Sequence, residues 1–275
     1  MLTVFYREVQ MMKENNTLLP KNRREQFKIL LKENVLNYFF FSLFTSIFVI
    51  PLFVWFFFST YADLFDGLLF YKTLYTYLIA LPLFLFASLG FAGLDYYLQK
   101  QIYNEGVSFL STFFEGISKN FKEYLLSFTC IWMISFLLRV SVGYFSSDTQ
   151  INGYLRVVFT AAMYVLYFFF LFVFLRSNIE SLTYKGSFLT HLKNSLIFTF
   201  GKPHVSIGIA LFSYLPLLLF EAIPMYESQM ILLFVEAFFY LLFGELIMVL
   251  SSDYFFDLTL NKDYPEMYRK GLKND

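Results

Sequence analysis

Four ionisable residues lie inside otherwise apolar stretches of this chain: Arg139, Glu221, Glu236 and Glu245. A charged side chain at the centre of a bilayer costs about 2.5–3.5 kcal/mol on insertion scales, so such residues need a partner, water or a function. At about 1.5 Å per helical residue, Arg139 and Glu236 lie at a similar depth below one end of their stretches. Glu221 lies somewhat nearer that end. We therefore expect Arg139 to pair with Glu236 or Glu221.

Three interpretations of Arg139 remain open on the sequence alone. The pair fixes helix packing, it lines a polar cavity or substrate route, or Arg139 snorkels to the surface without a partner. Glu245 has no lysine or arginine at its depth, so it is protonated, faces a wet cavity or meets a partner protein. Glu236 and Glu245 are nine residues apart and face opposite sides of a helix, so we do not expect them to form one site.

Residues for catalysis or metal binding are scarce. The two histidines, His191 and His204, are expected at the membrane surface, and no HExxH pattern, nucleophile elbow or phosphate-binding loop occurs. Asp253 and Asp257 stand one helical turn apart, but only Asp95 is available as a second acidic group, so a solvated helix end is the favoured interpretation. We expect no catalytic residue, cofactor or metal, and a non-enzymatic protein; a membrane-embedded enzyme is the weakest alternative.

The composition of the chain indicates that membrane-spanning helices hold the candidate residues. Hydrophobic residues make up 58% of the 275 residues and charged residues 15%, against the roughly 25% charged in soluble domains. A bilayer core needs about 20 apolar residues per helix. We predict an all-α, polytopic transmembrane helical bundle whose main partner is the lipid bilayer, with no nucleic acid. A basic segment at 1–33 precedes a transmembrane domain at 34–252 and a tail at 253–275. The six spans are expected at about 35–60, 73–97, 124–145, 155–176, 204–225 and 229–252.

The distribution of basic residues predicts the orientation. Eighteen of the 21 lysines and arginines fall before the first span, between spans two and three, between spans four and five, or in the tail. Basic residues near span ends mark the cytoplasmic side. We expect a multi-pass protein of the plasma membrane with both termini in the cytoplasm.

Two of these loops contain short amphipathic stretches, at 107–122 and 188–198. In the second, leucines oppose a polar face that includes His191 and Lys193, which is typical of an interfacial elbow helix. The stretches share the pattern Gly-(Val)-Ser-Phe-Leu-Ser/Thr, and Lys119-Asn120 and Lys193-Asn194 follow. We predict an internal repeat of about 80 residues, each an elbow helix and two spans. Chance similarity between apolar sequences is the alternative. Small residues at 88–93 predict close helix contact.

The stretch Gly106–Lys122, which reads GVSFLSTFFEGISKNFK, resembles the YesL-like membrane proteins, the DUF624 family of Gram-positive bacteria. The resemblance covers about residues 35–260 and includes the later Lys193-Asn194; the basic N-terminal extension is longer than in that family. It implies a non-enzymatic accessory or scaffold subunit that works beside carbohydrate ABC importers. The implied partners are other membrane subunits, an ABC permease or its ATPase.

A permease subunit is the main alternative. ABC permeases dock their ATPase through a cytoplasmic loop of the form Glu-Ala-Ala-x-x-x-Gly, and Glu180 and Gly186 have this spacing between spans four and five. The alanine pair and the apolar motif that should follow are absent. The candidate docking residues are therefore Glu180, Gly186, Lys119, Asn120, Lys193 and Asn194.

Overall fold

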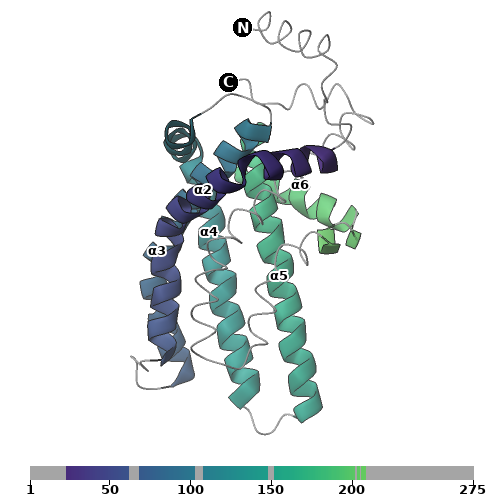
Figure 1. Ribbon diagram of the computed structural model, residues 1–275. Coiled ribbons are helices and arrows are strands. Elements are labelled where there is room, and N and C mark those ends of the chain that lie inside the picture. The colour runs from purple at the N-terminus through teal and green to yellow at the C-terminus, as the bar shows by residue number, and fades with distance from the viewer. Residues whose placement is uncertain are drawn as a thin grey trace, which may run out of the picture. The chain divides into compact units, whose positions relative to one another are not determined.

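The computed structural model describes residues 23–61, 68–102, 108–147, 152–201, 203–204 and 206–208. Its elements are all helices: α2 (Arg23–Tyr61), α3 (Leu69–Ile102), α4 (Phe109–Ser147), α5 (Gly153–Thr183) and α6 (Phe188–Gly201) (Figure 1). The chain divides into two units, Met1–Leu36 and Asn37–Asp275. The described part of the first unit is the beginning of α2. The contacts below all lie within the second unit.

Four helices are long and apolar enough to cross a membrane. The qualifying segments are Val35–Phe56, Leu69–Gln101, Phe109–Phe145 and Gly153–Thr183. Each contains most of one of the first four predicted spans, which confirms the all-α class and four apolar helices of spanning length. The predicted spans at 204–225 and 229–252, and the tail at 253–275, lie outside the described residues. Six spans, the orientation and the repeat therefore stay predictions.

The stretch at 107–122 is not a separate elbow helix. Its described part, from Phe109, opens α4, which runs without a break to Ser147 over 39 residues. At 1.5 Å per residue this helix is about 58 Å long, well beyond a hydrocarbon core of about 30 Å. Part of α4 must therefore extend past the core if the helix spans a bilayer, and the amphipathic beginning is the part suited to do so.

Small residues bring α3 and α4 into close contact. A Cβ on Gly93 would lie 2.7 Å from Phe113 Cδ2, and a Cβ on Gly116 would lie 2.6 Å from Tyr96 Cβ. Ala92 and Ser88 are fully buried. The predicted close contact at 88–93 is confirmed, because only side chains this small let the two backbones approach. Helix α4 packs between α3 and α5, and α6 packs on α5 (Figure 1).

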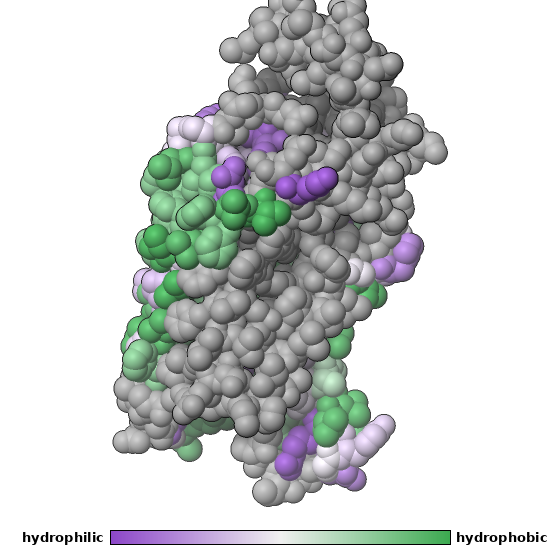
Figure 2. All heavy atoms as spheres, in the orientation of Figure 1, coloured by the Kyte–Doolittle hydropathy of each residue, from purple (hydrophilic) through white to green (hydrophobic). Residues whose placement is uncertain are grey.

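Aromatic rings join α2 to this seam. Phe41 stacks on Phe109 with ring centroids 4.0 Å apart, and Phe48 stacks on Phe86 at 4.9 Å. Outward-facing positions of the described helices carry many large apolar side chains. Figure 2 shows hydrophobic residues along the left edge, with hydrophilic residues gathered above them and at the lower end of the view. Such a surface suits lipid, in which exposed apolar side chains cost nothing.

Candidate functional site

The last two turns of α5 are polar and buried. Every residue from Arg176 to Thr183 has little exposed surface, although most of these residues are polar. Some hydroxyls are satisfied by their own helix: Ser177 Oγ donates to the Phe174 carbonyl at 2.8 Å, and Ser181 Oγ donates to the Asn178 carbonyl at 2.6 Å. Most buried polar groups are hydrogen-bonded or paired. Among the described residues, neither polar atom of the Asn178 side chain has a hydrogen bond, whereas Glu180 has partners from another helix.

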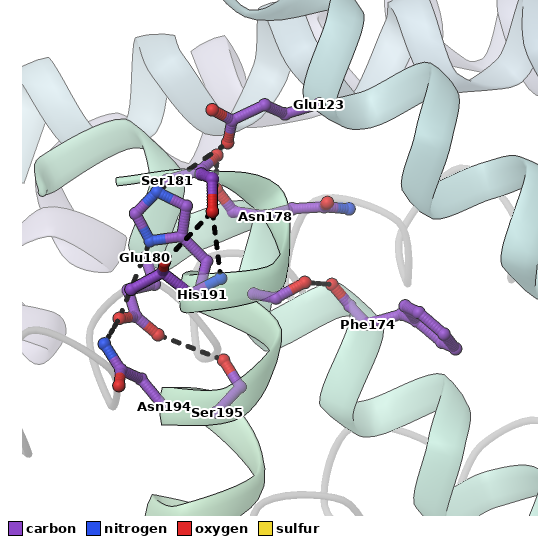
Figure 3. Close-up of polar contacts among 11 residues, drawn as sticks. Glu123, Phe174, Asn178, Glu180, Ser181, His191, Asn194 and Ser195 are labelled. Atoms are coloured by element: carbon purple, nitrogen blue, oxygen red, sulfur yellow. Dashed lines mark hydrogen bonds and ion pairs between the residues drawn. The ribbon is translucent and has the colours of Figure 1, made fainter. Parts of the chain in front are cut away.

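Glu180 finds its partners on α6. Asn194 Nδ2 donates to Glu180 Oε1 at 2.7 Å, and Ser195 Oγ donates to Oε2 at 3.2 Å. His191 Nδ1 lies 3.6 Å from Oε1, and both the glutamate and histidine side chains are 1% exposed. Figure 3 shows these side chains converging from α5 and α6. We call Glu123, Glu180, His191, Asn194 and Ser195 the polar joint.

His191 also faces α4. Its Nε2 lies 4.0 Å from Oε2 of Glu123, a side chain that is 26% exposed (Figure 3). The ring fits tightly against the connection between α5 and α6, where a Cβ on Gly186 would lie 2.9 Å from His191 Cε1. The histidine thus lies between two carboxylates that come from different helices.

Two further contacts bring α3 to the same end of the bundle. Tyr124 Oη of α4 donates to Asp95 Oδ2 of α3 at 2.6 Å, and Asp95 is 2% exposed. Gln99 Nε2 of α3 donates to Thr183 Oγ1 of α5 at 2.8 Å. Polar contacts therefore connect α3, α4, α5 and α6 next to the turn at 184–187.

The geometry of the polar joint suits positioning rather than nucleophilic or metal chemistry. A Ser-His-carboxylate triad needs the serine hydroxyl bonded to the imidazole, but Ser195 Oγ bonds to Glu180 and both ring nitrogens of His191 lack a hydrogen bond. Those nitrogens face different carboxylates. Among the described residues, no three His, Cys, Asp or Glu side chains are placed to hold one metal ion.

The six predicted docking residues differ in depth. Lys119, Gly186 and Lys193 are exposed. Lys119 Nζ lies 2.9 Å from Glu115 Oε1 and donates to Tyr96 Oη at 3.2 Å. Asn120 is buried and donates to the carbonyl of Gly116 in its own helix at 3.1 Å. Glu180 and Asn194 bond to each other, so the carboxylate of Glu180 faces the interior.

The two Lys-Asn pairs do not occupy equivalent places. Helices α4 and α6 begin alike, with Ser108 Oγ against Ser111 Oγ and Ser187 Oγ against Thr190 Oγ1. Counted from these serines, Asn120 comes 12 residues later and Asn194 seven residues later. The shared helix start favours the predicted repeat. The two Lys-Asn pairs do not support it, because they lie at different distances from that start.

The predicted intramembrane pair is not among the described contacts. Arg139 lies on an exposed face of α4. Glu221, Glu236 and Glu245 lie outside the described residues. The pairing of Arg139 therefore stays a prediction.

The prediction that His191 lies on a water-facing side of its helix is wrong. The buried residues of α6 are His191, Ser195 and Thr199, whereas Leu189 is 72% exposed. The polar face of α6 points inward because Glu180 and Glu123 lie there. The sequence contains one signal for this burial. His191, Ser195 and Thr199 are spaced four apart, so they form one polar helix face that could meet a buried carboxylate as well as water.

No protein-family model, curated protein or solved structure matches this chain.

Proposed function

We propose that this chain is a six-span plasma-membrane protein with both termini in the cytoplasm. We further propose that it serves as a non-enzymatic accessory or scaffold subunit of a transport system. The four long apolar helices and the segregated basic residues support the membrane part of this proposal. The resemblance of Gly106–Lys122 to the YesL-like family supports a role beside a carbohydrate ABC importer.

One observation supports the accessory role: the carboxylate of Glu180 in the polar joint is buried between α5 and α6. The Glu180 carboxylate is buried and contacts Asn194, Ser195 and His191, an arrangement that fixes α6 against α5. Fixing α6 leaves Lys193 and the neighbouring apolar side chains of its outer face exposed. A rigid surface with exposed apolar and basic groups is suited to binding a partner.

A permease subunit is the second candidate, and the exposed Gly186 favours it. In that role the turn between α5 and α6 would dock an ATPase. Glu180 would contribute from inside by holding the turn, since its carboxylate points towards α6.

A pull-down from mild detergent tests these roles. We expect permease subunits to be recovered in a fixed ratio with this chain. Lys119→Glu combined with Lys193→Glu should lower that recovery at least about tenfold, because reversing charge at a docking rim disfavours the complex. Lys72→Glu, near the start of α3, is the matched control and should leave recovery unchanged.

The recovered chains separate the candidates. Recovery of an ATPase without any other permease, together with its loss in Gly186→Asp, would support the permease role. Recovery of this chain alone would contradict both proposals.

A further inference from the structure

Among the described residues, the imidazole of His191 is enclosed without a hydrogen-bonding partner. Its side chain is 1% exposed, and Nδ1 and Nε2 are both buried atoms that lack a hydrogen bond. Oε2 of Glu123, the atom that faces Nε2, also lacks one. Three polar atoms are thus buried next to one another, with only ionic contacts between them (Figure 3).

A neutral imidazole fits this enclosure poorly. It carries one N–H, so the other nitrogen would point its lone pair at a carboxylate. A doubly protonated ring points an N–H at each carboxylate, and both contacts become ion pairs. Buried polar groups without partners are costly, whereas a paired charge is tolerated. The enclosure therefore matches the imidazolium form.

Glu180 provides a fixed negative charge for that form. Asn194 donates to one of its oxygens and Ser195 to the other. These two hydrogen bonds hold the carboxylate in place, with Oε1 at 3.6 Å from Nδ1 of the ring.

We propose that His191 is a buried proton-binding site that latches α6 to α4 and α5. One proton from water binds the ring and completes the two ion pairs, to Glu123 and to Glu180. Its release to water returns the ring to the neutral form and leaves one carboxylate without its cation. The latch is closed when the proton is bound and weakened when it is lost. This inference does not depend on the docking proposal.

The charged groups around His191 are consistent with this assignment. Helix α4 contributes Glu123 and α5 contributes Glu180. The guanidinium of Arg176 in α5 interacts electrostatically with Glu180 and lies 5.8 Å from the ring centroid of Phe198. Lys193 of α6 is exposed. Helix α3 contributes the neutral Gln99, which bonds to Thr183.

Thiol modification measures the latch directly. In a Cys130→Ala background, Thr199→Cys places a thiol on the buried face of α6, about two turns after His191. Lys193→Cys places one on the exposed face of the same helix. Both thiols are modified by a soluble maleimide in detergent micelles, and the ratio of the two rates reports how often α6 opens. Taking the ratio removes the increase in thiol reactivity with pH that both positions share.

We expect the ratio of the rate at position 199 to the rate at position 193 to be about tenfold higher at about pH 8 than at about pH 5, because the latch is weakened when the proton is lost. A ratio that stays constant over this range in the protein with His191 intact would overturn the proposal, and this measurement needs no change to the latch itself.

Two variants assign the pH dependence. His191→Gln cannot bind the proton, so its ratio should be high and the same at both pH values. Glu123→Gln removes one carboxylate at the partly exposed edge of the polar joint. It should reduce the pH dependence of the rate ratio while the protein stays folded. If His191→Gln kept the full pH dependence, another group would be responsible and the proposal would fail.

Discussion

At the scale of single residues, the main feature is a buried carboxylate that organises its neighbours. Glu180 accepts hydrogen bonds from two side chains of α6 and lies beside the imidazole of His191. Removing one partner of such a cluster is expensive, because the other partners stay buried without compensation.

We therefore expect Glu180→Ala to lower the free energy of unfolding by about 3–5 kcal/mol. The loss leaves Asn194 and Ser195 without their common acceptor and His191 without one of the two carboxylates beside it. Thermal unfolding in mild detergent, followed by circular dichroism, measures the change.

Glu115→Ala is the matched control. Its carboxylate lies 2.9 Å from Lys119 Nζ, but the two side chains are 41% and 48% exposed. Exposed ion pairs contribute between about 0 and 1 kcal/mol, so this variant should unfold near the parent temperature. Equal losses in both variants would refute the assigned role of Glu180.

At the scale of elements, helix contact is set by residue size. The α3–α4 seam is closed at Gly93 and Gly116, where an added Cβ would meet Phe113 or Tyr96. Both contacts are closer than a real Cβ tolerates, so a methyl group there must push the helices apart or displace a ring.

Gly93→Ala and Gly116→Ala should each destabilise the protein by about 1–3 kcal/mol through this overpacking. Gly201→Ala provides the comparison, since no described residue lies within 4 Å of a Cβ at that position; alanine there should be neutral or stabilise by up to about 1 kcal/mol. Unfolding midpoints in detergent distinguish the two classes. A Gly201 variant less stable than the seam variants would refute the argument.

How much of the fold can be predicted from the sequence depends on how far apart in the chain the interacting residues lie. The four apolar helices follow from local composition and length, and the small residues at 88–93 indicate a close contact without naming its partner. The polar joint does not follow from local patterns, because His191 meets Glu123 across 68 positions of the chain. The periodicity of α6 reveals a polar face, but not that this face meets carboxylates instead of water.

At the scale of the whole molecule, the central question is which side of the membrane carries the polar joint. Helix α5 begins near Tyr154 and reaches the joint at Thr183; its 31 residues span about 46 Å. This length exceeds a hydrocarbon core of about 30 Å. If α5 crosses the bilayer, its two ends lie on opposite sides, and the basic residues beyond Thr183 mark the cytoplasmic one.

Cysteine labelling of intact cells measures this orientation. In a Cys130→Ala background, we expect Tyr154→Cys to react with a membrane-impermeant maleimide in intact cells. Tyr154 is 76% exposed at the start of α5. Lys193→Cys should react only after the membrane is opened, because α6 follows the opposite end of α5. The reverse pattern would invert the topology and place Lys193 outside the cytoplasm. Reaction of both thiols in intact cells would show that α5 does not cross the bilayer, because an apolar helix that spans the core cannot present both ends to one compartment.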